Sequence, residues 1–214
     1  MSTSGAERDA MARARESSAI SRARESSAMA RARESSAMAR ARELGTSVLG
    51  TTSPNPAVGA VVLDADGVPV GEGATAPPGG PHAEIAALAQ AGPRARGGTV
   101  VVTLEPCAHT GRTGPCADAL IEAGVARVVV AVPEPTEPAG GGADRLRAAG
   151  VEVEVGVERE AAEAGALAGW LTAVREQRPF VVWKVAATLD GRVAAADGSS
   201  RWITGEQARP PLHR

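Results

Sequence analysis

Short runs of small and branched apolar residues alternate with segments of helical composition along most of this 214-residue chain. The strand-like runs span 57–63, 68–73, 99–104, 125–132 and 151–157, and the helical segments span 82–91, 116–124, 143–149 and 158–174. Strands that alternate with helices pack as a sheet between helical layers. Aromatic residues make up only 2% of the chain, so aliphatic side chains must fill its core, which suits strands buried on both faces. We therefore predict a three-layer α/β/α sandwich around a mostly parallel central sheet.

The first 44 residues differ from the rest, because the units ARARESSAI, SRARESSAM and ARARESSAM follow one another every nine residues. Nine residues turn a helix through about 900°, so successive copies face opposite sides and no continuous apolar stripe forms. We predict that residues 1–37 are a low-complexity extension, solvated, partly helical or disordered, and that only the last copy, near 38–44, packs on a domain. A basic arm for nucleic acid and an organellar transit peptide are the alternative interpretations, although every copy carries a Glu.

Charge and hydropathy exclude several classes of protein. The net charge is −2 and the pI is near 6.0, whereas a nucleic-acid surface normally has a strong basic excess. No run approaches the ~18 apolar residues of a membrane span, and the first 30 residues lack the continuous apolar stretch of a secretory signal. Two Cys cannot form a disulfide framework. We predict a cytoplasmic protein that acts on a small molecule and has neither a nucleic-acid nor a membrane partner.

Three soft metal ligands occur next to predicted helix starts. His82 opens the helix at 82–91, and Cys107 and Cys116 lie between the strand at 99–104 and the next helix. One imidazole and two thiolates are three ligands of a tetrahedral zinc ion, which leaves a fourth position for water in a catalytic site. Zinc lowers the pKa of such a water to about 7. The residues therefore predict a catalytic zinc (Zn2+) centre.

Glu84 lies two residues after His82, where its carboxylate can stand beside the metal without binding it. It could then carry protons between the water, a ring nitrogen and departing ammonia. His-x-Glu followed by Pro-Cys and a second Cys is typical of zinc deaminases. The alternatives are two inert buried thiols and a closed structural zinc site, which would need a fourth protein ligand such as His109.

With the Cys-x8-Cys spacing and the segment Thr52-Ser53-Pro54-Asn55-Pro56-Ala57-Val58-Gly59, the chain resembles the bifunctional bacterial riboflavin-biosynthesis deaminase/reductases. The resemblance runs from about 38 to 209 and implies a cytidine-deaminase-like domain at 38–175. It also implies hydrolysis of the ring amine of 2,5-diamino-6-ribosylamino-4(3H)-pyrimidinone 5′-phosphate. In the family pattern His82, Cys107 and Cys116 match the zinc ligands, and Glu84 matches the catalytic acid/base.

The same resemblance assigns further contacts. Asn55 matches a substrate-binding Asn, and an Asn held between two prolines offers a donor and an acceptor to a pyrimidine edge. Its alternative role is a turn residue that caps its own backbone. His109 and Arg112 match positions near the ribosyl phosphate, and a guanidinium suits a phosphate dianion. Taken alone, Arg112 could equally be a solvated surface charge.

Residues 179–214 are similar to the opening of the NADPH-dependent reductase domain of that family. In that comparison Ala186 and Trp202 match NADP-contacting positions, and Ser200 matches a substrate-contacting one. About 35 residues cannot enclose a core or a dinucleotide, so we expect a truncated reductase start without reductase activity. Its apolar residues Val181, Val182 and Trp183 would favour a homo-oligomer. Deamination of another base or nucleoside, and an inactive zinc-binding module, are the rival functions.

Overall fold

The computed structural model describes residues 5–109, 114–137 and 139–200. In the first helix, the side chains are described from residue 24 onward. The chain forms two compact units, Met1–Arg178 and Pro179–Arg214. The helices of the first unit are α1 (Gly5–Ser47), α2 (Ala83–Ala91), α3 (Cys116–Ala123), α4 (Gly142–Ala148), α5 (Arg159–Glu163) and α6 (Ala168–Glu176). Its strands are β1 (Gly59–Leu63), β2 (Pro69–Ala74), β3 (Thr99–Leu104), β4 (Arg127–Val132) and β5 (Glu152–Val155).

The strands form one mixed sheet in the order β2-β1-β3-β4-β5. β3, β4 and β5 are parallel, but β1 is antiparallel to both β2 and β3, so the prediction of a mostly parallel sheet is wrong. The reason is the tight turn at 64–67, which joins β1 to β2 and can connect only antiparallel neighbours. Helix α2 then carries the chain across β1, and β3 continues in the direction of β2.

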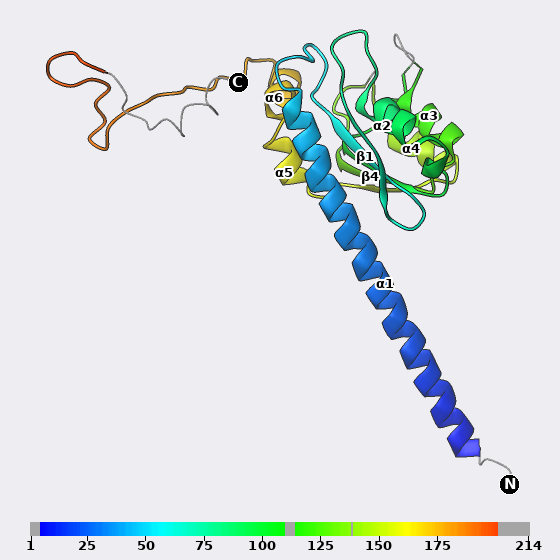
Figure 1. Ribbon diagram of the computed structural model, residues 1–214. Coiled ribbons are helices and arrows are strands. Elements are labelled where there is room, and N and C mark those ends of the chain that lie inside the picture. The colour runs from blue at the N-terminus through cyan, green and yellow to red at the C-terminus, as the bar shows by residue number, and fades with distance from the viewer. Residues whose placement is uncertain (1–4, 110–113, 138, 201–214) are drawn as a thin grey trace. The chain divides into compact units, whose positions relative to one another are not determined.

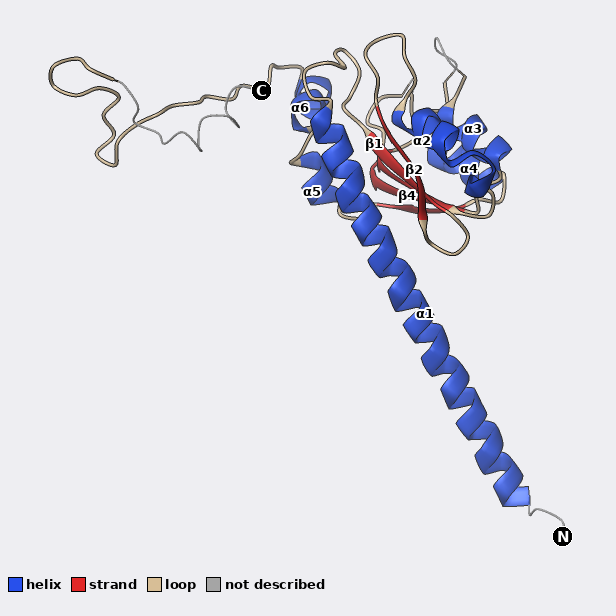
Figure 2. Ribbon diagram, in the orientation of Figure 1, coloured by secondary structure: helices blue, strands red, loops and turns tan. Residues whose placement is uncertain are grey.

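The helices lie in two layers, as expected of an α/β/α sandwich. In Figure 1, α2, α3 and α4 gather on one side of the sheet, and α1, α5 and α6 lie on the other. Figure 2 shows the strands as the middle layer between them. Because a helical layer covers each face, the central strands are buried on both sides.

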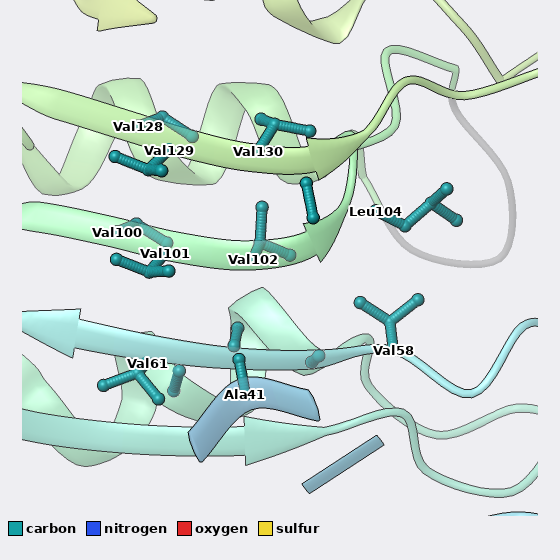
Figure 3. Close-up of a cluster of buried hydrophobic side chains, with 14 of the residues drawn as sticks. Ala41, Val58, Val61, Val100, Val101, Val102, Leu104, Val128, Val129 and Val130 are labelled. Atoms are coloured by element: carbon teal, nitrogen blue, oxygen red, sulfur yellow. The ribbon is translucent and has the colours of Figure 1, made fainter. Parts of the chain in front are cut away.

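Valine fills the core, in keeping with the scarcity of aromatic residues. Val128, Val129 and Val130 of β4 are each 0% exposed, and so are Val100, Val101 and Val102 of β3. Figure 3 shows these side chains alternating to the two faces of neighbouring strands, with Val61 of β1 in the same cluster. β-branched residues suit this position because their restricted χ1 angles lose little freedom in a strand.

The nine-residue repeat is helical along its whole described length, within α1. Only its end packs on the sheet: Met38 and Ala41 are 0% exposed, whereas Met29 is 59% exposed. A Cβ on Gly59 would lie 1.9 Å from the carbonyl oxygen of Ala41, so the absent side chain lets α1 approach β1 closely. Contacts begin before residue 38, because Arg127 of β4 pairs with Glu34 at 2.7 Å.

Two predicted elements differ from the structure. The expected helix at 158–174 is divided into α5 and α6, with Gly165 in the interval between them. The strand-like segment 180–188 forms no strand. A strand is stabilised by pairing with neighbours, and the described part of the second unit contains no helix or strand to supply them. Among the described helices, none is both long enough and apolar enough to cross a membrane.

Candidate metal centre

Three side chains from separate segments converge at one end of the sheet. His82 is the N-cap of α2, Cys107 follows β3, and Cys116 is the first residue of α3. Nδ1 of His82 lies 3.2 Å from Sγ of Cys116 and 3.7 Å from Sγ of Cys107. All three ligand atoms lie within 4.8 Å of one another. The structure therefore brings together the three metal ligands that the sequence predicts.

The spacing of these atoms fits a zinc ion. Zinc bonds of about 2.3 Å to sulfur and about 2.0 Å to nitrogen, at tetrahedral angles, place S and N roughly 3.6 Å apart. The two S–N distances in the chain, 3.2 and 3.7 Å, lie on either side of that value. Two thiolates and one imidazole are also the donors that zinc prefers, and three protein ligands leave one tetrahedral position open.

Local electrostatics favour a charged ligand set. Hydrogen bonds from Cys116, first from its side chain, and from His82 lower the pKa of the Cys107 thiol. The contact with Cys107 in turn raises the pKa of His82, against the opposing effect of burial. The backbone N–H of Cys116, at the start of α3, donates to Sγ of Cys107 at 3.4 Å. The positive end of that helix therefore faces a thiolate.

Glu84 occupies the first turn of α2 and is only 4% exposed. Burial raises the pKa of its carboxyl group. It lines the same cleft as His82 and Cys107, and among the described residues it lies outside the close group of three ligand atoms. A carboxylate at such a place can exchange protons with a molecule in the cleft without holding the metal.

The start of α2 is held in place by its contact with β2. A Cβ on Gly73 would lie 2.2 Å from the carbonyl oxygen of Ala83 and 2.6 Å from the amide nitrogen of Ala87. Only a residue without a side chain fits between β2 and the first turns of α2. That close packing fixes the backbone from which His82 and Glu84 project.

Glu105, the residue after β3, holds the turn that carries Cys107. Its Oε1 accepts a hydrogen bond of 2.9 Å from the amide of Ala143, and its Oε2 accepts one of 3.1 Å from the amide of Glu134. One carboxylate thus connects the end of β3, the loop after β4 and the start of α4. Charge-assisted bonds of this kind are stronger than neutral ones.

A cleft of about 220 Å³ opens beside the ligands. Asn55 lines it together with the two prolines that flank it, and the exposed His109 lines it too. Both residues line the cleft, and their contacts with substrate stay predictions. Arg112 and Trp202 lie outside the described residues. Ser200 and Ala186 are exposed residues of the second unit, so their proposed roles also stay predictions.

The sequence prediction missed several side chains of the cleft wall. Thr75, Glu105, Glu134, Thr136 and Trp170 all line it. The first four come after strands β2, β3 and β4, and their distance from the ligands depends on how those strands are arranged in the sheet. The sequence alone therefore could not place them. Trp170 could have been singled out from the sequence, because it is the only Phe, Tyr or Trp before residue 180.

Comparison with known proteins gives the class of this domain. Residues 31–132 match the family model of the cytidine and deoxycytidylate deaminase zinc-binding region. Together with the sandwich fold and the His/Cys/Cys group, this match defines a zinc-binding domain of the cytidine-deaminase class. Residues 179–214 match the model of the RibD C-terminal domain.

The relatives define the family more closely. The riboflavin biosynthesis protein RibD of Mycobacterium tuberculosis H37Rv is 56% identical over 167 residues, or 78% of this chain and 49% of the relative. A diaminohydroxyphosphoribosylaminopyrimidine deaminase/5-amino-6-(5-phosphoribosylamino)uracil reductase from Thermotoga maritima superposes with a TM-score of 0.78 at 42% identity, covering 85% of this chain and 52% of that one. The chain belongs to the RibD family. It spans about half the length of the curated relatives it matches.

Proposed function

We propose that the chain catalyses zinc-dependent hydrolytic deamination of 2,5-diamino-6-ribosylamino-4(3H)-pyrimidinone 5′-phosphate. The products are 5-amino-6-(5-phosphoribosylamino)uracil and ammonia, in riboflavin biosynthesis. One observation carries the proposal: the ligand atoms of His82, Cys107 and Cys116 lie within 4.8 Å of one another, on the cleft that Glu84 also lines. Membership of the RibD family, with a relative from Thermotoga maritima named as such a deaminase, supports the choice of substrate.

The ligands and Glu84 have separate tasks in this reaction. Nδ1 of His82 and the sulfurs of Cys107 and Cys116 would hold the metal, and bound zinc would supply a water that ionises near neutral pH. The Glu84 carboxylate would pass one proton of that water to the ring nitrogen and the other to the departing amine, as the C–N bond breaks and the oxygen of the water becomes the ring carbonyl. Its burial in the first turn of α2 keeps it fixed at the cleft and away from bulk water.

Recognition of the substrate is assigned to the cleft wall. Asn55 would pair with the edge of the pyrimidinone ring, because its amide offers both a donor and an acceptor. His109 and Arg112 would bind the ribosyl phosphate. Support for the first two comes from the cleft that Asn55 and His109 line, and support for Arg112 comes from the family pattern alone.

A reductase site is not part of the proposed function. We keep the prediction that residues 179–214 as given have no reductase activity, since Ala186 and Ser200 are exposed and a dinucleotide needs an enclosing fold, so NADPH should bind weakly if at all. Titration of the purified chain with NADPH, followed by the cofactor's fluorescence, tests this. Saturable binding in the micromolar range would contradict it.

The experiment for deamination is ammonia release from the diaminopyrimidinone ribosyl phosphate by purified, zinc-loaded protein. Glu84→Gln should lower turnover by about 100- to 10,000-fold, the range of general acid–base catalysis, while zinc stays bound. Turnover of cytidine but not of the phosphate would assign the chain to another base. Zinc binding without any turnover would make it an inactive zinc-binding module.

Two accompanying proposals concern the setting of the enzyme. Cys107 and Cys116 form no disulfide, which suits a reducing compartment and supports the cytoplasm. The exposed Val181, Val182 and Trp183 support self-association into a homo-oligomer. Light scattering of the purified chain measures the second, and a monomer at micromolar concentration would contradict it.

A further inference from the structure

Trp170 is the only Phe, Tyr or Trp in the first 178 residues, and it lies on the wall of the metal cleft. It projects from α6, is half-buried and packs against the aliphatic core. Elsewhere in this unit the core is built from Val, Leu, Ile, Met and Ala. The one large flat side chain therefore stands at the cleft that also contains His82 and Glu84.

The charge of the cleft indicates which part of a ligand could lie beside it. Among the described lining residues Glu84, Glu105 and Glu134 carry carboxylates, and none is Lys or Arg. Carboxylates would repel a phosphate dianion, whereas a neutral heterocycle can lie beside them, so the phosphate of the proposed substrate would lie toward His109 instead. The volume of about 220 Å³ is below the roughly 300–1,000 Å³ of clefts that enclose drug-sized ligands. The cleft thus suits the ring of the proposed substrate, with the phosphorylated ribosyl group extending beyond it.

The indole also has hydrogen-bonding capacity to spare. Within the described residues no hydrogen bond to its Nε1–H is formed. A buried Trp usually finds a partner for this group, and the polar end of a half-buried one commonly serves an interface. The donor is therefore left to water or to a ligand group that lies beside the indole rather than on its face.

We propose that Trp170 is a substrate-recognition residue, against whose indole the pyrimidinone ring of the substrate packs. This rests on the proposed deaminase function and deepens it. The flat π surface gives the ring a contact that aliphatic side chains cannot, and such stacking changes binding of one base by roughly 5- to 150-fold. Trp170 takes no part in proton transfer, so its removal should act on KM rather than on kcat.

Two substitutions separate the flat surface from mere apolar packing. Trp170→Leu should raise KM by about 5- to 50-fold, with kcat within about threefold of the parent and zinc content and thermal stability retained. Trp170→Phe, which keeps a planar ring, should recover most of the loss. Trp183→Leu is the matched control, because Trp183 is 83% exposed in the second unit, and it should leave KM unchanged.

A second measurement stands independently of the folding of the Leu variant. In a full-length chain with Trp183→Phe and Trp202→Phe, Trp170 is the only tryptophan, and Glu84→Gln added to it prevents turnover. Saturation with the diaminopyrimidinone ribosyl phosphate, verified by equilibrium dialysis, should quench or shift the Trp170 emission. Unchanged emission at saturation, or an unchanged KM in a folded Trp170→Leu enzyme, overturns the proposal. Absence of turnover in the parent protein would instead overturn the deaminase function.

Discussion

The two units of the chain differ in how far they bury residues of the same type. Val129, in β4 of the first unit, is 0% exposed, whereas Val181, in the second, is 76% exposed. The hydrogen bonds of the second unit around Thr188 and Asp197 join residues at most four positions apart. In the first unit Arg127 reaches Glu34, 93 positions away, to join β4 to α1.

The difference shows that apolar, β-branched composition specifies a strand only where partners exist. Residues 180–188 have the same character as the strands of the first unit, yet the described part of the second unit offers them no neighbouring strand and no covering helix. Burial of apolar surface is the dominant favourable contribution to folding, and it is absent there. The predicted effects of substitutions should follow this contrast.

Loss of a metal ligand should have the largest effect, and it should be confined to the first unit. Cys116→Ser replaces a buried thiolate by a poorer zinc ligand, so bound zinc should fall from about one per chain to below about 0.1. Turnover should drop at least about 1,000-fold, because the water loses its activation. Metal analysis and ammonia release measure both, with Val193→Ala, an exposed position in the second unit, as the control. Zinc retained in the Cys116→Ser protein would exclude this residue as a ligand.

Filling the space between β2 and α2 should be the next most damaging change. Gly73→Ala introduces a Cβ 2.2 Å from the Ala83 carbonyl oxygen, and overpacking of this kind costs about 3 kcal/mol of the free energy of unfolding. The displaced first turn of α2 should also weaken zinc binding. Urea unfolding and zinc titration test the two effects. Gly114→Ala is the control, since no described atom lies within 4 Å of its added Cβ.

A matched pair of Val→Ala substitutions measures the contrast between the units directly. Val129→Ala should lower the free energy of unfolding by about 2 kcal/mol, because it leaves a cavity between two covered faces of the sheet. Val181→Ala should change it by less than about 0.5 kcal/mol, as expected of an exposed position. Equal losses in chemical denaturation would mean that residue 181 is buried in solution.

The smallest effect is expected at the ion pair of Arg40 on α1 with Glu72 on β2. The hydrogen bond from Arg40 lowers the pKa of Glu72 below its ordinary value of 4.5. The folded state therefore binds this proton less readily than the unfolded chain, so the pair stabilises the fold above that value and loses its effect as the pH falls through the lowered pKa. Glu72→Gln should slightly reduce the melting temperature at pH 7, and the difference should shrink as the pH falls below 4.5 and vanish below the lowered pKa. A difference that persists in acid would need another cause.

Much of the fold follows from local pattern. The strands at β1, β3 and β4 are runs of Val, Ala and Leu between turns, and their boundaries lie within about two residues of the predicted ones. The direction of β1 was not predicted, because it depends on which strands become neighbours rather than on composition. The interruption between α5 and α6 was missed too, since a Gly inside a helical segment only weakens the helix.

The parts of the site that could be predicted are those that depend on rare residue types with a specific chemistry. His82, Cys107 and Cys116 belong to rare residue types. Their spacing, 25 positions from His82 to Cys107 and nine from Cys107 to Cys116, was specific enough to predict that they converge. Glu105 and Thr75 could not be assigned in the same way, because Glu and Thr are common and their role depends on contacts made across the sheet. Asn55 and His109 were named as candidate substrate contacts from the family resemblance alone. In the structure they line the same cleft as His82 and Cys107.

The nine-residue period of α1 has a geometric consequence for its length. Each copy contributes about 2.5 turns and about 13.5 Å of axial rise. Since the side chains that dock on β1, such as Met38 and Ala41, belong to the last copies, gain or loss of units at the outer end would change the reach of the helix and leave the docked turns untouched. Two units together make five whole turns, so an even change restores the azimuth of every outer side chain and an odd change reverses it.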